Sequence, residues 1–154
     1  MSTINIPVCV IKELPFSNVM GNSIANTPEA AAEIFRNYMN EDYVPNGVEN
    51  MMVMSLDVKN KPISIQSVSI GHLSGTTATQ REIFRMAILQ NAASIILCHN
   101  HPSGDVTPSS ADLSTTRNLV KASEVLDIKM LDHVIISTKD KKYISLRESG
   151  LVNF

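Results

Sequence analysis

One apolar run constrains the fold of this chain more than any other segment. The sequence ENMMVMSLDV, from Glu49 to Val58, is almost continuously apolar and has the length of a single β-strand. A strand that faces water on one side alternates apolar and polar residues, whereas a strand covered on both sides does not. We therefore expect a central strand, in a sheet that carries a layer of other structure on each face.

Strand and helix patterns alternate along the rest of the chain. Further strands are expected at Ile6–Leu14, Ile63–Ile70, Ser94–Cys98 and Met130–Ser137, with a short edge strand at Lys141–Leu146. Helices are expected at Thr27–Asn40, from Thr79 onward and at Ser109–Leu126, each beginning at a hydroxyl residue suited to an N-cap. Their inward residues should include Ile83, Phe84, Ala87 and Ile88, and later Leu113, Thr116, Leu119 and Val120. The alternation predicts an α/β fold in which helices flank a mixed β-sheet.

Length and charge limit what the chain can do. Its 154 residues suit one compact domain, which we place at residues 27–154, after a lead-in of residues 1–26 that holds the first strand. The formal net charge is -2, whereas domains that hold nucleic acid by electrostatics are usually basic. The dense basic run at Lys139–Lys142 is typical of a solvated turn. We therefore do not expect tight binding of nucleic acid.

The sequence also bears on the compartment. No apolar run approaches the roughly 18 residues that cross a bilayer, and the first residues lack the pattern of a secretory signal. Cys9 and Cys98 are the two cysteines, and they form no CxxC motif. We expect a cytoplasmic protein with no membrane partner. The oligomeric state stays open.

Two histidines one residue apart end an apolar run in the stretch CHNHPSGDVTPSSAD. In extended backbone, residues i and i+2 face the same side, so the imidazoles of His99 and His101 can converge on one ion. Cys98 should face the opposite way, and we expect it to be a buried core thiol. A His-x-His pair is also common in ordinary turns, so the pair alone does not decide between a metal site and a turn.

The loop after the histidines can return a carboxylate to them. The residue before Pro102 is held extended, and Gly104 lets the chain reverse. Ser109 then begins a helix that carries Asp112 in its first turns. Two histidines and one carboxylate are the ligand set of open zinc sites, in which water takes a fourth position. Ser109 and Asp112 also have an ordinary interpretation, as a helix cap and a partner of the helix dipole.

A zinc hydrolase also needs a base for the water. Glu49 and Glu82 are the candidates. Glu82 is already explained by a T-x-x-E capping box with Thr79, whereas an acid that begins a buried strand has to be solvated, paired or used. Asp132–His133 could support the metal ligands from behind, but a pair at the start of a strand is the favoured interpretation.

These residues together match a known pattern. His99, His101 and Pro102, followed by Ser109 and Asp112, resemble the JAMM (MPN+) metalloprotease motif H-x-H-P…S-x-x-D. The longer segments REIFRMAILQNAASIILCHNHPSGD, PSSADLSTTRNLV and LDHVIIS…YISLRESGL resemble the RadC family, a bacterial branch that carries this JAB-type domain. The resemblance covers most of the chain and makes the metal site the favoured interpretation.

The resemblance implies a JAB/MPN-type α/β domain, related in layout to the cytidine deaminases. It implies Zn²⁺ bound by His99, His101 and Asp112. By the same match, Ser109 would donate a hydrogen bond to an oxyanion, and Glu49 would serve as the general acid/base.

Two features depart from the family pattern. RadC proteins often carry an N-terminal helix-hairpin-helix region associated with DNA, and we expect none in a chain of this length. His72 stands where a small polar residue is expected after a glycine. The first departure weakens any transfer of a role in DNA repair, and the second leaves the site intact.

The favoured function is therefore that of a zinc-dependent hydrolase of amide bonds, a JAMM-type metallopeptidase or isopeptidase with a peptide or protein substrate. A RadC-type accessory protein of DNA repair, without proteolytic turnover, is the main alternative. A zinc deaminase would need the H-x-E…P-C-x-x-C signature, which the sequence lacks. A purely structural metal site would need a fourth protein ligand, for which Cys98 or His72 would have to turn inward.

Overall fold

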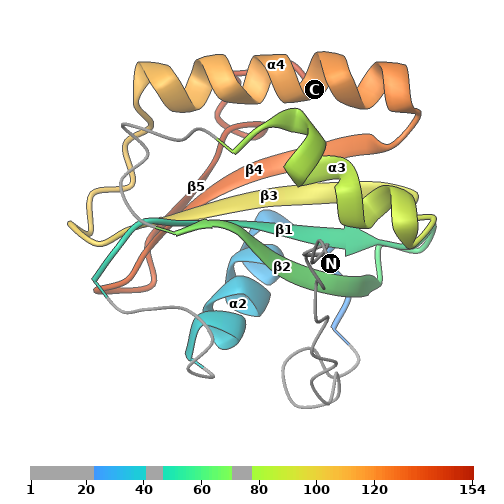
Figure 1. The fold of residues 1–154 in the computed structure, drawn as a ribbon. Coiled ribbons are helices and arrows are strands. Elements are labelled where there is room, and N and C mark those ends of the chain that lie inside the picture. Colours follow the sequence, from blue (N-terminus) through green and yellow to red (C-terminus); the bar gives the residue numbers. More distant parts are fainter. Residues whose placement is uncertain (1–22, 41–46, 71–77) are drawn as a thin grey trace, which may run out of the picture.

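The computed structural model describes residues 23–40, 47–70 and 78–154, and its elements follow the order that the sequence predicts (Figure 1). The strands are β1 (Asn50–Leu56), β2 (Pro62–Ile70), β3 (Ser94–His101), β4 (Lys129–Ser137) and β5 (Tyr143–Ser145). The helices are α2 (Pro28–Tyr38), α3 (Gln80–Leu89) and α4 (Ser110–Leu126). The expected strand Ile6–Leu14, Cys9 and His72 lie outside the described residues, and the division at residue 26 stays a prediction.

The strands form one mixed sheet in the order β2-β1-β3-β4-β5. β1 pairs antiparallel with both β2 and β3, and β5 pairs antiparallel with β4. β3 and β4 are parallel, and α4 makes the crossover that a parallel pair requires. The predicted α/β fold with a mixed sheet is confirmed.

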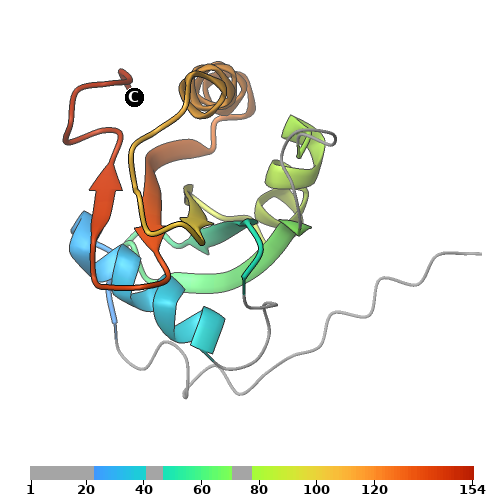
Figure 2. The same cartoon turned by 90° about the vertical axis from the view of Figure 1, so that its left-hand side faces the viewer.

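Helices cover both faces of this sheet. α2 lies on one face and α3 and α4 lie on the other, as the two views show (Figures 1 and 2). All seven residues of β1 are buried. Met52 and Met54 pack in the core against α2, whereas Met51 and Val53 pack in the core under α3 and α4. β1 is therefore an inner strand covered on both sides, as its unbroken apolar sequence predicts.

Two details differ from the expectations. β3 runs three residues beyond Cys98, because its partners continue the ladder: Met51 pairs with His99, and Ser137 pairs with His101. On α3, Met86 is buried whereas Ile88 is half exposed. These two side chains lie at similar angles from the centre of the apolar stripe, so packing against the sheet rather than periodicity decides which one is covered. In the described part of the chain, no helix is long and apolar enough to cross a bilayer.

A buried carboxylate ties β4 to the segment that follows it. The Oδ2 atom of Asp132 accepts a hydrogen bond from the Ser145 hydroxyl at 2.6 Å. Its Oδ1 atom accepts from the backbone N–H groups of His133 at 2.7 Å and Arg147 at 3.2 Å. Burial raises the pKa of this carboxyl group, and the hydrogen bonds oppose that rise. Asp132 therefore anchors the β5 edge of the sheet.

We expect Asp132→Ala to lower the free energy of unfolding by about 1–3 kcal/mol, because buried donors lose their acceptor. Urea denaturation followed by circular dichroism measures this change. Glu124→Ala, at an exposed position of α4, is the control and should shift stability by less than about 0.5 kcal/mol. Equal stabilities of the two variants would contradict the anchoring role.

Candidate metal centre

The two motif histidines lie on the last residues of β3, in extended backbone. His99 is fully buried and His101 is partly exposed. Cys98 points to the opposite face, where it packs in the core against α2, and burial raises the pKa of its thiol well above the usual value. The predictions of a shared face for the histidines and of a core thiol are confirmed.

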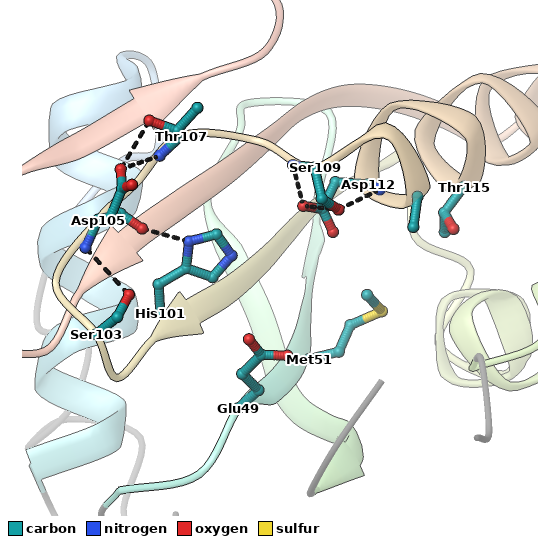
Figure 3. A pocket seen from close by; sticks show the side chains of 10 residues that line it. Glu49, Met51, His101, Ser103, Asp105, Thr107, Ser109, Asp112 and Thr115 are labelled. Atoms are coloured by element: carbon teal, nitrogen blue, oxygen red, sulfur yellow. Dashed lines mark hydrogen bonds between the residues drawn. The ribbon is translucent and has the colours of Figure 1, made fainter. Parts of the chain in front are cut away.

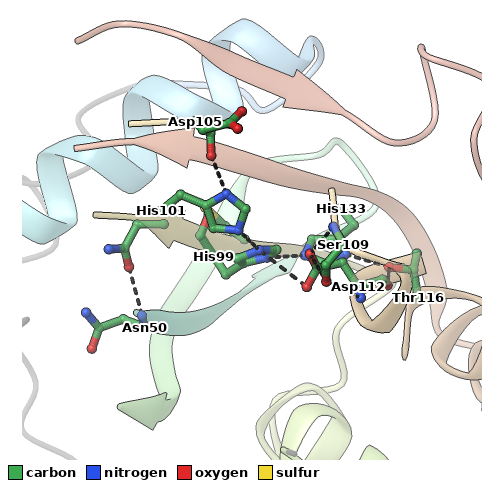
Figure 4. Close-up of polar contacts among 10 residues, drawn as sticks. Asn50, His99, His101, Asp105, Ser109, Asp112, Thr116 and His133 are labelled. Atoms are coloured by element: carbon green, nitrogen blue, oxygen red, sulfur yellow. Dashed lines mark hydrogen bonds and ion pairs between the residues drawn. The ribbon is translucent and has the colours of Figure 1, made fainter. Parts of the chain in front are cut away.

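Asp112 reaches the histidines from the N-terminus of α4 (Figure 4). It is the third helical residue and forms a capping box with the N-cap residue Ser109. The Asp112 Oδ2 atom accepts hydrogen bonds from the Ser109 N–H and hydroxyl, both at 2.7 Å, and the Ser109 oxygen accepts from the Asp112 N–H at 3.1 Å. The capping box occupies one carboxylate oxygen and leaves the other directed at His99.

Three potential ligand atoms converge at this point. The His99 Nε2 atom lies 2.9 Å from His101 Nε2 and 3.5 Å from Asp112 Oδ1. All three ligand atoms lie within 4.8 Å of one another. Two ligand atoms of a tetrahedral zinc ion are about 3.3–3.4 Å apart. The separations of 2.9 and 3.5 Å from His99 Nε2 lie on either side of this value. The cluster of His99, His101 and Asp112 could therefore hold a metal ion.

The loop after β3 orients the outer histidine. The His101 Nδ1 atom lies 2.5 Å from the backbone oxygen of Asp105. A carbonyl oxygen only accepts, so Nδ1 carries the proton and the Nε2 lone pair faces the cluster. Gly104 has a φ of 86°, and a Cβ atom there would come within 3.0 Å of the Lys139 side chain. The reversal that returns Asp105 to His101 therefore requires the glycine.

Burial keeps the inner histidine neutral. The pKa of His99 is lowered to about 4, mainly because burial desolvates the ring; the Asp112 carboxylate opposes this shift and the neighbouring His101 adds to it. At neutral pH the His99 ring is therefore uncharged, which is the form in which imidazole binds a metal.

His133 belongs to the site, contrary to the expectation of a simple pair at the start of a strand. Its Nε2 atom lies 2.8 Å from His99 Nδ1, and its Nδ1 atom lies 2.6 Å from the Thr116 hydroxyl oxygen (Figure 4). Asp132 instead turns toward Ser145. His133 pairs with Leu97 across the parallel ladder, which puts it on the same face as His99. That register depends on tertiary pairing, so the dipeptide alone did not decide between the two interpretations.

Asn100, between the two histidines, also has a role that the sequence did not signal. This fully buried side chain accepts a hydrogen bond from the Asn50 N–H at 2.8 Å and donates one to the Val48 carbonyl at 2.9 Å. These two backbone groups flank Glu49. The strand that carries the histidines therefore holds the backbone on both sides of Glu49.

A pocket of about 350 Å³ opens beside the cluster. It is lined by Glu49, Met51, His101, Ser103, Asp105, Thr107, Ser109, Ala111, Asp112 and Thr115. Figure 3 shows the Glu49 carboxylate pointing into the space between His101 and the start of α4. Glu82 does not line this pocket, and its carboxylate accepts a hydrogen bond from the Thr79 N–H at 2.8 Å in the predicted capping box. The pocket thus brings Glu49, but not Glu82, together with the cluster.

Comparison with known proteins identifies the family of this chain. The family model for the RadC-like JAB domain matches residues 25–151, which is most of the chain. The chain belongs to this family. The resemblance to RadC proteins that the motifs suggested is therefore confirmed.

Individual relatives agree with this assignment. The UPF0758 protein TTE0897 of Caldanaerobacter subterraneus is 51% identical over 106 residues, covering 69% of this chain and 45% of the relative. A UPF0758 protein of Desulfitobacterium hafniense is 41% identical over 136 residues, covering 88% and 57% respectively. The chain spans about half the length of these relatives, and their names state no activity.

We expect the protein to bind about one zinc ion per chain and His101→Ala to lose it, because two ligands do not hold the ion. The variant should stay folded, since His101 lies at the edge of a core that packs without it. Elemental analysis after zinc loading and desalting measures the binding. Asp140→Asn, which alters a carboxylate in the exposed lysine turn, should keep full metal content. Full metal content in His101→Ala would contradict the ligand assignment.

Proposed function

We propose that this RadC-like JAB domain is a zinc-dependent hydrolase of amide bonds, a peptidase or isopeptidase acting on a peptide or protein. The observation that carries the proposal is the open ligand set of His99, His101 and Asp112 in a pocket that also holds the Glu49 carboxylate. A metal ion that activates water and a proton acceptor beside it are the two groups with which a metallohydrolase cleaves an amide.

The composition of the ligand set favours zinc. Imidazole nitrogens and a carboxylate oxygen suit this ion, and three protein ligands leave a fourth position open, as in catalytic rather than structural zinc sites. When bound, zinc supplies Lewis acidity, which lowers the pKa of a water molecule toward about 7 and polarises a carbonyl group.

Glu49 is the proposed general acid/base. It precedes β1, is partly exposed in the pocket and is not part of the three-residue ligand cluster. Its carboxylate would accept a proton from the attacking water and later deliver it to the nitrogen of the leaving amine. The Asn100 side chain supports this role, because it fixes the backbone on both sides of Glu49.

Ser109 is proposed to stabilise the oxyanion. Its hydroxyl donates to Asp112 Oδ2 in the structure, but the Ser109 N–H donates to the same oxygen. The Asp112 carboxylate therefore keeps a partner if the hydroxyl rotates toward a substrate oxygen. A donor placed where negative charge develops lowers the barrier of acyl transfer.

The rival functions have less support. A structural zinc site would need a fourth protein ligand, and the candidate Cys98 lies on the opposite face of the sheet. A deaminase would need a cysteine-rich signature that the sequence lacks. The accessory role in DNA repair rests on the family name alone.

Glu49→Gln separates catalysis from metal binding. The amide keeps the shape of the side chain but accepts no proton, so hydrolysis should fall by about 10²–10⁴-fold while zinc content stays unchanged. Both quantities are measured on zinc-loaded protein, with a panel of fluorogenic peptides and lysine-linked isopeptides that identifies the substrate.

Glu82→Gln is the matched control for this variant. Glutamine also serves in a capping box, so near-normal hydrolysis is expected. If Glu82→Gln were inactive and Glu49→Gln active at equal metal content, the assignment of the base would be wrong. If the zinc-loaded wild type cleaved no peptide or isopeptide of this panel, the proposed hydrolase activity would be wrong.

Binding of duplex DNA should be weak and lost near physiological salt, because the net charge is -2. A mobility-shift titration at two salt concentrations, with and without chelator, measures this. Tight binding at physiological salt that survives loss of the metal would instead favour the accessory protein.

A further inference from the structure

We infer that His133 and Thr116 are positioning residues for the metal centre: their hydrogen bonds hold the His99 proton on Nδ1 and thereby leave the Nε2 lone pair free for a metal ion. This inference rests on the proposed function for its purpose, since the metal is the one that the hydrolase uses. The proton positions themselves are a property of the metal-free protein and can be tested without any substrate.

Thr116 sets the donor-to-acceptor direction of the hydrogen bonds that lead to His99. Its hydroxyl oxygen lies 2.7 Å from the backbone carbonyl of Asp112, one turn earlier in α4, and 2.6 Å from His133 Nδ1. A carbonyl oxygen only accepts, so the single hydroxyl proton of Thr116 is donated there. Toward His133, the same oxygen can then only accept. His133 Nδ1 must therefore carry a proton.

That proton determines the next bond. His133 is fully buried, and a neutral imidazole carries one proton, so its Nε2 atom is an acceptor. The atom 2.8 Å from it is His99 Nδ1, which must be the donor. His99 then holds its only proton on Nδ1. The chain from the Asp112 carbonyl through Thr116 and His133 to His99 is satisfied at each step (Figure 4).

The consequence appears at the other side of the His99 ring. His99 Nε2 carries a lone pair, and it lies 2.9 Å from the Nε2 lone pair of His101 and 3.5 Å from a carboxylate oxygen of Asp112. Three electron-rich atoms that face one another repel unless a cation lies among them. The hydrogen bonds among Thr116, His133 and His99 thus set the ligand atoms in the protonation state that binds a metal, already in the metal-free protein.

The opposite proton order would work against binding. If His133 donated from Nε2, His99 Nδ1 would be the acceptor and His99 Nε2 would carry a proton aimed at the cluster. Metal binding would then require the proton of each ring to move from Nε2 to Nδ1. Loss of a residue that hydrogen-bonds to a metal ligand typically lowers metal affinity by about 10–100-fold.

Nitrogen NMR of the metal-free wild-type chain tests the inference directly. Long-range ¹H–¹⁵N spectra of histidine rings near pH 7 distinguish a protonated from an unprotonated nitrogen. We expect protonated Nδ1 and unprotonated Nε2 in both His99 and His133. Protonated Nε2 in either ring would overturn the inference, whether or not the protein hydrolyses any amide.

Substitutions at Thr116 add a second readout. Thr116→Val removes the acceptor for His133 Nδ1–H, so the protons of His133 and His99 should move to Nε2 and the zinc dissociation constant should rise by about 10–100-fold. Thr116→Ser keeps the hydroxyl and should restore wild-type proton positions and affinity. Competition with a chromophoric zinc chelator measures the affinity.

Ser123→Ala is the matched control, because the Ser123 hydroxyl also donates to a carbonyl within α4, at 2.7 Å from Val120, and is no member of the chain to His99. It should bind zinc as the wild type does. If Thr116 had a purely structural role, Thr116→Val would lower stability but leave the proton of each ring on Nδ1. Wild-type proton positions and zinc affinity in Thr116→Val would therefore overturn the inference, and if that variant fails to fold, the wild-type spectrum decides.

Discussion

The position of β3 between an antiparallel and a parallel neighbour is the constraint on which the site depends. Pairing with β1 brings the start of that strand, and with it Glu49, beside His99 and His101. Pairing with β4 puts His133 behind His99. The crossover between the two parallel strands is α4, whose first turn supplies Asp112. Residues that are far apart in the chain therefore meet because one buried strand has two fixed registers.

The structural and the proposed functional interpretations of Asp112 are compatible, since each uses a different oxygen. Oδ2 accepts from Ser109 and closes the capping box, whereas Oδ1 lies 3.5 Å from His99 Nε2. A capping box fixes a side chain relative to the helix axis, because both partners belong to the same turn. A residue that stabilises the helix is thus also held in one orientation toward the histidines, and an ordinary explanation of a motif does not exclude a chemical one.

Local patterns predicted most of the fold, and tertiary pairing decided what they missed. The apolar sequence of β1 predicted an inner strand covered on both faces, and the i, i+2 spacing of His99 and His101 predicted their shared face. His133 could not be assigned in the same way, because its contact with His99 depends on the register of β4 against β3. The role of Asn100 likewise depends on the register of β1 against β3, which a single sequence does not display.

Asn100 links the two halves of the proposed chemistry. It lies between His99 and His101 and holds the backbone of Val48 and Asn50, the neighbours of Glu49, through hydrogen bonds of 2.9 and 2.8 Å. The separation between the proposed base and the potential metal ligands thus depends on two hydrogen bonds, one buried and one partly buried, and on one strand pairing, rather than on the path of the chain between Glu49 and His99. Short connections of this kind restrict relative motion. An active site needs this restriction, because a displacement of about 1 Å can cost a hundredfold in rate. The middle residue of the His-Asn-His segment therefore contributes to the geometry of the site although it is not one of the three potential ligands.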